Sequence, residues 1–595
     1  MSPQPTYDSA ALDPVNEGTG NASLRGHGGE LVQDGERVVI DFEGRVIEGR
    51  RGETLAAALT AAGIRELRLT QSDRPRGIFC GMGVCQECLV EIDGRANQRA
   101  CMTKLDAKVS VRRQHHLAEA GAVPASGSGS READVRTPDI LVLGGGAGGL
   151  NAAAAAARAG AKVLLADERP EPGGQFYKQP LAIPALAEEI AGDGQFAGGR
   201  ALIAEAVAAG VEMRRGVQIW GAFEPLDLML FDGQASFLCR PKRLIVAAGA
   251  YERALPLPGW TLPGVMTTGA AQTLLRSYRV LAGRRVLLAG NGPLNIQVAL
   301  ELARAGAEVL AVVELAPKPG PWALPALGRM LSNTPALAIR GMRQIAELKR
   351  HGAAMLHGSV LSGVTQIAGG LRAEVKAWPA GGGARVFEVD AVAMGYGFQP
   401  SNEILRALGC AHRFDPARGH LVTERDAEGR TTIPEIYAVG DCAGLGGAPA
   451  AEAEGVIAGL DAARSLGFAP SAGQQQAAAV ARTGLRRHRR FQAGLWQLFA
   501  APRLLAELAQ PDTLICRCEE LSRVEIEAGI APGSESIGAV KRQTRGGMGR
   551  CQGRYCGPVI AALSAERRGE ALSEAGHWAP RPPVKPIRIG DITGE

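Results

Sequence analysis

The sequence has little of what nucleic-acid-binding proteins need. Among its 595 residues, 66 Lys and Arg stand against 61 Asp and Glu, a formal net charge of +5, and aromatic residues make up only 4%. Proteins that bind nucleic acid through overall charge have a larger basic excess. Proteins that bind single strands without sequence preference also carry rows of aromatic rings on which the bases stack. We therefore expect no nucleic-acid partner.

Long apolar runs are also missing. No apolar stretch reaches the roughly 18 residues that a membrane-spanning helix needs. Residues 1–34 are polar and lack the apolar centre of a secretion signal. The sequence therefore predicts no transmembrane segment and a place in the reducing cytoplasm, with peripheral contact at the inner face of the membrane as an alternative.

Histidine is scarce, and its nine copies show neither the spacing of a zinc site nor that of a catalytic triad. No catalytic base with a partner is identifiable, so the catalytic residues stay unassigned. Glycine is abundant, at 79 residues, but without the G-X-Y period of collagen. A chain of this length with 46% apolar residues has room for about four domains with their own cores.

Eight of the eleven cysteines fall into two groups, and the first group predicts a [2Fe–2S] cluster. Cys80, Cys85 and Cys88 have the spacing C-x4-C-x2-C and are followed by Cys101, as in plant-type ferredoxins. Zinc is the alternative. Zinc ligands, however, usually arrive as C-x2-C or histidine pairs, and this segment has one such cysteine pair and no neighbouring histidine.

The second group comprises Cys516, Cys518, Cys551 and Cys556, arranged as C-x-C and C-x4-C with 32 residues between them. It resembles the small [2Fe–2S] domain of bacterioferritin-associated ferredoxin, and only this resemblance identifies the cluster. Basic residues interleaved with glycines surround the second pair, which suits an anionic cluster with four thiolates. Zinc and a basic nucleic-acid loop are the alternatives.

The run DILVLGGGAGGLNAAAAAARAGAKVLLADE predicts a strand, a glycine turn, a helix and a strand that ends in acid, which is a Rossmann-type dinucleotide unit. Gly144 allows the tight turn, Gly146 lets the backbone approach a pyrophosphate, and Gly149 lets the helix pack on the strand. Asp167 is the expected ribose ligand. Glu168 is the alternative, because predicted strand ends carry an error of about two residues.

Two later motifs resemble those of flavoproteins with two dinucleotide-binding domains. In IPEIYAVGDCAG a strand ends at Gly440 and Asp441, where that family binds the ribityl chain of the flavin. The run LIVAAGAYERALPLPG resembles the chain crossover of the same fold. FAD is therefore the expected cofactor. The resemblance also implies cofactor-binding roles for Ala147, Gly174, Gln175 and Gly249.

A second dinucleotide unit, RVLLAGNGPLNIQVALELARAGAEVLAVVE, contains Gly290 and Gly292 and ends at Glu314. Asn295 replaces the third glycine, and a larger side chain at this position disfavours pyridine-nucleotide binding without threatening the fold. Glu314 suits a ribose diol better than a 2′-phosphate. NAD(H), another nucleotide and a structural role all stay open for this unit.

The order of patterns divides the chain into segments. No C-x2-C or C-x4-C redox pair lies between 137 and 470, so the isolated cysteines there are interpreted as structural. The predicted segments are a disordered tail at 1–34, a [2Fe–2S] domain at 35–116, a flexible linker at 117–136, an FAD-binding domain at 137–275 and 395–470, an NAD(P)-binding-like domain at 276–394, a helical connector at 471–510, a second [2Fe–2S] domain at 511–570 and a Pro-rich extended tail at 571–595.

This order resembles the alpha-type subunits of hetero-oligomeric FAD-dependent amine and imino acid dehydrogenases and oxidases. That family includes opine oxidase, D-hydroxyproline dehydrogenase, hydrogen cyanide synthase and sarcosine oxidase. The phrases RPRGIFCGMGVCQEC, ADERPEPGGQ and VKRQTRGGMGRCQGRYC carry the resemblance. It implies three fold classes in succession: an α+β ferredoxin-like (β-grasp) domain, an α/β flavoprotein with two dinucleotide-binding domains, and a small helical [2Fe–2S] domain.

The resemblance also implies a function. Substrate oxidation is expected on a separate FAD-containing beta subunit, similar to D-amino-acid oxidase. The present chain is then expected to relay electrons from an amino acid, imino acid or opine to a quinone or another acceptor. The alternatives are a self-contained NAD(P)H-dependent reductase that feeds an external partner, and a non-catalytic docking scaffold.

Overall fold

The structure is a computed structural model that describes residues 24–25, 36–115, 134–181, 192–379, 383–530 and 536–593. The predicted tail at 1–34 lies outside these ranges apart from Leu24 and Arg25, and so does the predicted linker at 117–136 up to residue 133. Among the helices of the described ranges, none combines the length and the apolar character needed to cross a bilayer.

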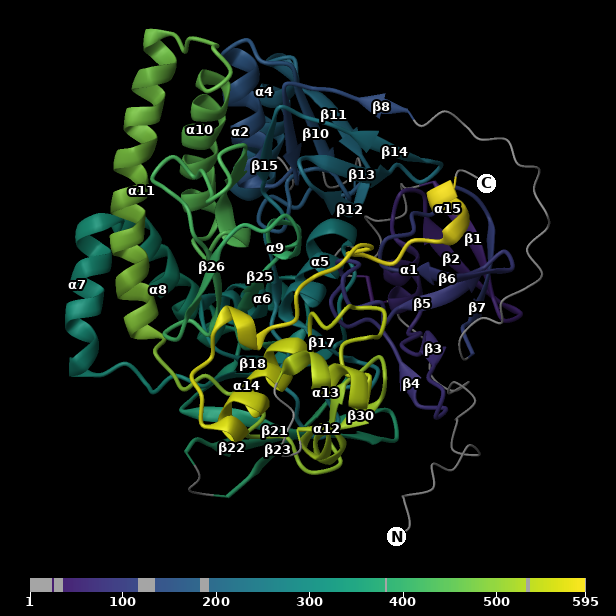
Figure 1. The fold of residues 1–595 in the computed structure, drawn as a ribbon. Helices are drawn as coiled ribbons and strands as arrows, with labels where there is room; N and C mark the ends of the chain where they lie inside the picture. The colour runs from purple at the N-terminus through teal and green to yellow at the C-terminus, as the bar shows by residue number, and fades with distance from the viewer. Residues whose placement is uncertain are drawn as a thin grey trace.

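The N-terminal domain is a five-stranded mixed sheet with one helix packed against it (purple in Figure 1). Its elements are β1 (Arg37–Phe42), β2 (Arg45–Arg50), α1 (Leu55–Ala61), β3 (Arg68–Leu69), β4 (Pro75–Arg76), β5 (Leu89–Ile92), β6 (Arg95–Arg99) and β7 (Val109–Arg113). The strand order is β2-β1-β7-β5-β6, with β1 antiparallel to β2 and parallel to β7. Val38, Ile40 and Phe42 point inward from alternate positions of β1 and share a core with α1. Thr54 starts the helix by accepting a hydrogen bond from the amide of Ala57 (3.4 Å).

The first dinucleotide-type domain contains a five-stranded parallel sheet with the order β11-β10-β9-β15-β28. Its main elements are β9 (Ile140–Leu143), α2 (Ala147–Arg158), β10 (Val163–Asp167), α4 (Gly194–Ala208), β11 (Glu212–Arg215), β15 (Arg243–Val246), β28 (Ile436–Ala438) and α10 (Ala448–Arg464). Helices α2 and α10 lie side by side in Figure 1. Their backbones are so close that a Cβ on Gly455 would lie 2.2 Å from the backbone oxygen of Gly148.

A four-stranded sheet with the order β12-β13-β14-β8, a short helix, a two-stranded sheet and a 3-10 turn complete this domain. These elements are β8 (Val135–Arg136), β12 (Gln218–Phe223), β13 (Asp227–Phe231), β14 (Ser236–Cys239), α9 (Glu403–Ala407), β26 (His412–Asp415), β27 (His420–Thr423) and η5 (Gly440–Cys442).

The second dinucleotide-type domain has a parallel sheet with the order β17-β24-β18-β19-β20 and a three-stranded antiparallel sheet, β21-β22-β23. The chain enters through β16 (Ala250–Glu252) and returns through β25 (Phe398–Pro400), which pair with each other antiparallel. The other elements are β17 (Val265–Thr267), α5 (Thr268–Tyr278), β18 (Arg285–Gly290), α6 (Pro293–Arg304), β19 (Glu308–Glu314), η4 (Pro321–Ala323), α7 (Leu324–Asn333), α8 (Pro335–Arg350), β20 (Ala354–His357), β21 (Ser359–Ile367), β22 (Gly370–Ala377), β23 (Arg385–Val389) and β24 (Ala391–Gly395).

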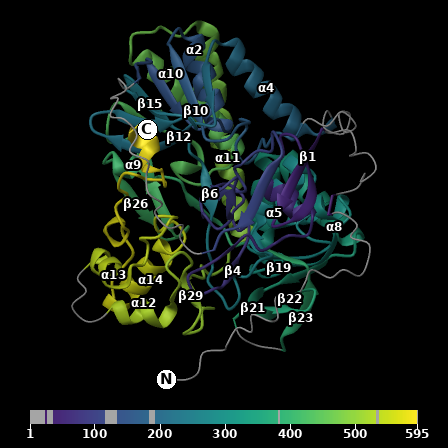
Figure 2. The ribbon, with the colours of Figure 1, turned by 90° about the vertical axis from the view of Figure 1, so that its right-hand side faces the viewer.

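The C-terminal part begins with a long helix that packs against α7 and α10, and then forms a small helical domain (yellow in Figure 1). Its elements are α11 (Ala472–Leu498), β29 (Leu514–Cys516), β30 (Leu521–Ser522), α12 (Arg523–Gly529), α13 (Ile537–Thr544), α14 (Gly557–Arg568), η6 (Glu574–Gly576) and α15 (Ile589–Thr593). The N-terminal and C-terminal domains meet where β4 and β29 lie near each other in Figure 2. There the hydroxyl of Thr70 donates to Oε1 of Glu520 (2.7 Å).

Candidate functional site

The four cysteines of the first group come together as two pairs. Cys80, Cys85 and Cys88 lie on the loop between β4 and β5, Cys101 follows β6, and all four are buried. The thiol of Cys80 is in hydrogen-bond contact with that of Cys85, and the thiol of Cys88 with that of Cys101. The structure therefore brings all four predicted ligands of this group together.

Backbone amides face the sulfur atoms of the first group. The amide of Cys85 donates to Sγ of Cys80 (3.3 Å), and the amide of Glu87 donates to Sγ of Cys85 (3.5 Å). Burial raises the pKa of Cys80, but hydrogen bonds from the Cys85 side chain and from backbone amides outweigh it and lower this pKa to about 6. Gly81 and Gly83 have φ values of +61° and +76°, which favour glycine. The loop is thus shaped to hold thiolates.

The second group also forms two pairs. Cys516 ends β29 and Cys518 follows it, while Cys551 and Cys556 precede α14. Side-chain hydrogen bonds join Cys516 to Cys556 and Cys518 to Cys551, and they lower the pKa of Cys516 and Cys551 and raise the pKa of their partners. A Cβ on Gly549 would lie 2.2 Å from Cβ of Cys518, so glycine is required where the two loops meet.

The pairing bears on which metal each group suits. A zinc site needs four ligands around one ion, whereas a [2Fe–2S] cluster divides four thiolates between two irons. The two pairs of thiols in each group match this division of ligands.

The two cysteine groups lie against each other, which the sequence did not predict. Cys80 and Cys551 belong to one buried hydrophobic cluster that also contains Phe79 and Tyr555. The rings of Phe79 and Tyr555 meet edge to face, with their centroids 5.4 Å apart. Since Phe79 precedes Cys80 and Tyr555 precedes Cys556, aromatic side chains from both cysteine loops fill the space between the two groups.

A buried ion-pair network joins the same two loops. Arg517 stands between the two cysteines of the C-x-C pair, and Glu87 directly precedes Cys88. Nε of Arg517 lies 3.6 Å from Oε1 of Glu87, and their side chains are 4% and 1% exposed. Arg68 and Arg76 contact Oε2 of the same carboxylate at 3.1 and 3.5 Å. Burial raises the pKa of Glu87, but the three guanidinium groups outweigh it and hold this pKa below its usual value.

Arg517 is held by aromatic rings as well as by charge. Its guanidinium carbon lies 4.0 Å from the ring centroid of Phe79 and 4.7 Å from that of Trp260. Nη1 of Arg517 donates to the backbone oxygen of Trp260 (3.1 Å), and the indole of Trp260 donates to the backbone oxygen of Leu514 (2.8 Å). The side chain therefore has one fixed position between the two cysteine loops.

The predicted flavin motifs meet at one edge of the first parallel sheet. Gly144 follows β9, Asp167 ends β10, Gly249 follows β15 and Asp441 follows β28. These four strands are parallel neighbours, so their carboxyl ends share the edge at which dinucleotides bind in such folds. Gly144 has a φ of +105°, and a Cβ on Gly149 would lie 1.8 Å from its backbone oxygen, so the turn requires both glycines.

The two acidic residues at the end of β10 have different partners. Asp167 is 8% exposed and accepts a hydrogen bond from the amide of Gly145, in the glycine turn, and burial raises its pKa. Glu168 forms ion pairs with Arg99 (2.9 Å) and with Lys585. Burial raises the pKa of Glu168, but these two cations outweigh it and lower the pKa to about 2. Of the two, only Asp167 contacts the glycine turn.

The remaining positions of the first unit surround the start of α2. Gly146 is the N-cap of α2 and Ala147 its first residue, so the N-terminus of the helix opens onto the same sheet edge. A Cβ on Gly174 would lie 2.8 Å from Cα of Gly146, so the two backbones touch. The backbone oxygen of Gln175 accepts a hydrogen bond from the ammonium group of Lys178 (2.7 Å).

Asp441 lies in η5, and its side chain contacts the loop that leads into α10. One of its carboxylate oxygens, Oδ1, accepts hydrogen bonds from the amides of Gly446 (2.7 Å) and Gly447 (2.8 Å). Burial raises the pKa of this carboxylate. Gly440 has a φ of +70°, and its amide donates to Glu454 (2.9 Å). The helix N-termini of α2 and α10 thus face the same edge, which suits the anionic part of a dinucleotide.

The second dinucleotide unit has a comparable turn. Gly290 ends β18, and Gly292, with a φ of +112°, is the N-cap of α6. Glu314 ends β19, is 1% exposed and accepts a hydrogen bond from the amide of Gly292 (3.0 Å). Burial raises the pKa of Glu314. Glu314 therefore contacts the glycine turn of the second unit, as Asp167 contacts that of the first.

Asn295 has a structural explanation in this unit. Its Oδ1 accepts a hydrogen bond from the hydroxyl of Thr268 (2.8 Å), and its Nδ2 donates to the backbone oxygen of Gly395 (3.0 Å). The side chain is 1% exposed. It therefore ties α6 to the neighbouring strand β24 by hydrogen bonds, where a glycine would allow close contact instead.

Two buried ionisable residues near these sites were not among the predicted site residues. Lys178 donates to the backbone oxygen of Gln175 and to Oε1 of Gln272 (2.9 Å), and burial lowers its pKa to about 7. Glu252 accepts a hydrogen bond from the amide of Gly269 (2.7 Å), and burial raises its pKa to about 7. Their burial depends on tertiary packing, so their spacing in the sequence gave no signal.

The isosteric variants Asp167→Asn and Glu168→Gln are expected to distinguish the roles of the two acidic residues. We expect Asp167→Asn to weaken FAD binding about tenfold, or ~1.4 kcal/mol, because it removes the carboxylate at the glycine turn. We expect Glu168→Gln to change FAD affinity less than about threefold, or ~0.7 kcal/mol, and to lower the thermal unfolding midpoint. Flavin fluorescence during titration into apoprotein measures the first effect, and calorimetry measures the second.

The pH dependence provides a control for Glu168. Its folded-state pKa is lowered from 4.5 to about 2, so its ion pairs stabilise the fold fully above pH 4.5 and lose this effect as the pH falls through 2. The difference in unfolding midpoint between the wild type and Glu168→Gln should therefore shrink on acidification. A larger loss of FAD affinity in Glu168→Gln than in Asp167→Asn would contradict the assignment of Asp167.

Comparison with known proteins covers nearly the whole chain. Residues 35–116 match the family model of the 2Fe-2S iron-sulfur cluster binding domain, residues 138–455 that of the pyridine nucleotide-disulphide oxidoreductases, and residues 511–595 that of the sarcosine oxidase A3 domain. Among solved structures, L-proline dehydrogenase from P. horikoshii has a TM-score of 0.68 at 21% identity, covering 94% of this chain and 98% of that one. This likeness confirms the predicted fold class.

Curated relatives extend the comparison. The opine oxidase A protein of Agrobacterium tumefaciens is 31% identical, over 76% of this chain and 91% of that protein. The hydrogen cyanide synthase protein HcnB of Pseudomonas aeruginosa is 32% identical, over 75% and 96%. The sarcosine oxidase alpha protein of a Corynebacterium species is 26% identical, over 95% of this chain and 57% of that protein. The chain therefore belongs to the pyridine nucleotide-disulphide oxidoreductases, as a flavin-type oxidoreductase in the family of opine oxidase A and HcnB.

Proposed function

We propose that this chain is the electron-relay component of a hetero-oligomeric FAD-dependent amine or imino acid dehydrogenase or oxidase. Oxidation of an amino acid, imino acid or opine to the imine on a partner flavoprotein subunit releases two electrons and two protons. This chain would pass the electrons to a quinone or another acceptor. The packing of the two cysteine groups across Phe79 and Tyr555 carries the proposal, because a relay needs neighbouring carriers.

The residues of the chain fit three prosthetic groups. The eight paired cysteines would hold two [2Fe–2S] clusters, and the sheet edge with Gly144, Asp167 and Asp441 would hold FAD. When bound, FAD supplies the exchange between two-electron and one-electron transfer. The chain itself would hold the thiolates with backbone amides, fix the ribose with Asp167, and exclude water between the cysteine groups with aromatic rings.

The need for a partner is supported by the relatives. Opine oxidase A, HcnB and sarcosine oxidase alpha are each named as subunits of their enzymes. The catalytic residues of substrate oxidation are not identifiable in this chain, which agrees with a substrate site elsewhere. The partner we propose is an FAD-containing beta subunit similar to D-amino-acid oxidase.

A self-contained NAD(P)H-dependent reductase is the second candidate. The contact between Glu314 and Gly292 keeps the turn of a nucleotide site and favours it. Against it, the hydrogen bonds of Asn295 explain the second unit as structure without a nucleotide. A docking scaffold without cofactors is the third and weakest candidate.

Anaerobic titration with NADH separates these functions. For a relay component we expect the visible flavin absorbance to stay unchanged when stoichiometric NADH is added to the isolated chain. We expect it to bleach when the co-purified partner and its amine substrate are present. Rapid stoichiometric bleaching by NADH alone would instead identify a reductase, and protein without flavin and iron would identify a scaffold.

A further inference from the structure

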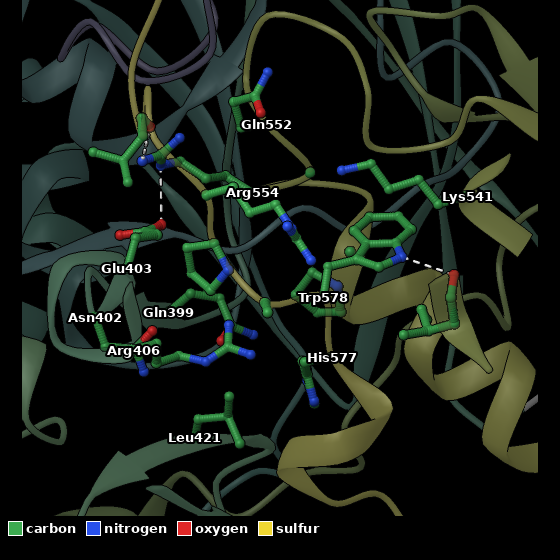
Figure 3. Close-up of a pocket in the computed structure, with 18 of the residues that line it drawn as sticks. Gln399, Asn402, Glu403, Arg406, Leu421, Lys541, Gln552, Arg554, His577 and Trp578 are labelled. Atoms are coloured by element: carbon green, nitrogen blue, oxygen red, sulfur yellow. Dashed lines mark hydrogen bonds and ion pairs between the residues drawn. The ribbon is translucent and has the colours of Figure 1, made fainter. Parts of the chain in front are cut away.

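A cavity of about 490 Å³ opens beside the second cysteine group. Its walls come from α13 and the start of α14, from β25, from α9 of the first dinucleotide-type domain, and from the segment 577–584. In Figure 3 the side chains of Lys541 and Trp578 lie on one side of this space and those of Glu403 and Arg406 on the other. Its volume lies within the range of cavities that bind small organic molecules.

The side chains around the cavity are strongly basic. Five lining residues are Lys or Arg, and Glu403 is the one lining carboxylate. Glu403 is already paired with Nε of Arg554 (2.9 Å), and Arg554 also donates to the backbone oxygens of Val584 and Cys551. Arg554 therefore serves the fold, and the excess positive charge rests with the other cations.

Two of the remaining cations are adjacent residues of α13, and both line the cavity. Lys541 is half-buried, with its ammonium nitrogen 5.5 Å from the ring centroid of Trp578, and Arg542 is exposed. No ion pair of either residue is found within the described ranges. On the opposite wall, Nε of Arg406 is buried without a hydrogen-bond partner, and its nearest carboxylate is that of Glu574 at 3.5 Å.

The backbone of α13 adds to this positive potential. Ile537 and Gly538, in the first turn of the helix, line the cavity. The hydroxyl of Ser536 caps the amide of Ala539 (3.3 Å), whereas the amides of Ile537 and Gly538 have no acceptor within the helix. Together with the helix dipole, these two amides favour an anion. The indole of Trp578 donates to the backbone oxygen of Ile537 (2.9 Å), which fixes an aromatic surface beside these amides.

We propose that this cavity binds an organic phosphate monoester. Its phosphate would be held by Lys541, Arg542 and the N-terminus of α13, and its apolar part would lie against Trp578 and Leu421. Gln552 and Arg554 line the cavity and stand between Cys551 and Cys556, so the ligand would lie against the loop of the second cysteine group. This inference does not depend on the proposed relay function, because it concerns binding alone.

Calorimetric titration of the holoprotein with 5′-AMP, inorganic phosphate and adenosine tests the proposal. We expect AMP to bind at least about tenfold more tightly than adenosine, because the phosphate supplies the charge contacts. The variant Lys541→Gln/Arg542→Gln should weaken AMP and phosphate binding at least about tenfold. Arg545→Gln is the matched control, since Arg545 ends the same helix but pairs with Glu519 (2.8 Å) and does not line the cavity.

Three outcomes would overturn the proposal. AMP binding that is unchanged in Lys541→Gln/Arg542→Gln would place the ligand elsewhere, for example at the second dinucleotide unit. Binding of phosphate without AMP would reduce the site to a simple anion site. Equal affinity for AMP and adenosine would show that the cations do not contribute to binding. Unchanged iron and flavin content in the variants shows that their folds are intact.

Discussion

The single variants Cys85→Ala and Cys556→Ala are each expected to remove one of the two clusters. Each cysteine is one of four paired thiols in its group, so its loss leaves one iron with an incomplete ligand set. Iron content should fall from about four to about two atoms per chain, and the spin count of the reduced protein should fall by about half. Elemental analysis and electron paramagnetic resonance measure the two effects.

Cys239→Ala is the matched control for these variants. Cys239 is fully buried like the proposed ligands, but it lies on β14 in a separate hydrophobic cluster. Iron content should therefore stay at about four atoms per chain. One zinc and two irons in the wild type, with the zinc lost in Cys556→Ala, would instead identify the second group as a zinc site.

Local motifs, together with the family that their order resembles, were sufficient to predict the fold class and the family. Strand, glycine turn, helix and acid lie close together in the sequence, so their order already specifies a parallel sheet with a dinucleotide edge. Gly144 and Asp441 are far apart along the chain, yet both follow parallel strands whose carboxyl ends must share an edge. Their meeting could therefore be predicted from topology, without any knowledge of side-chain contacts.

Choices between neighbouring residues could not be predicted in this way. Asp167 and Glu168 have the same charge and adjacent positions, and what separates them is the ion pair of Glu168 with Lys585, 417 residues away. Asn295 indicates a weakened nucleotide motif in the sequence, but its hydrogen bond to Thr268 depends on how α6 meets α5. Such contacts are set by packing between elements, which local patterns do not contain.

The contact between the two cysteine groups is the largest feature that the sequence did not indicate. Arg517 and Glu87 each stand within a cysteine motif, but only the docking of the N-terminal and C-terminal domains brings them together. The network buries four charged side chains, those of Glu87, Arg68, Arg76 and Arg517, and burial of a charge is costly unless it has a partner. Their mutual pairing at this interface therefore specifies one docked arrangement of the two domains.

Arg517→Gln is expected to shift the reduction potentials of both clusters in one direction, and Glu87→Gln is expected to shift both in the opposite direction. Reduction adds one negative charge, so loss of the cation should lower the potentials and loss of the carboxylate should raise them. A unit charge at roughly 8 Å in an effective dielectric of about 20 contributes ~2 kcal/mol, or ~90 mV for one electron. Redox titration monitored by electron paramagnetic resonance resolves the two clusters separately.

Two further variants make this result specific. Arg517→Lys keeps the charge between the cysteine loops, so both potentials should stay close to those of the wild type. Arg304→Gln removes a surface cation that is paired with Glu347 (2.7 Å) in another domain, and should shift neither potential by more than about 15 mV, since exposed charges are screened. A shift of only one cluster in Arg517→Gln and Glu87→Gln would contradict a network shared by both. Equal shifts in Arg517→Lys and Arg517→Gln would mean that side-chain shape, rather than charge, couples the two loops.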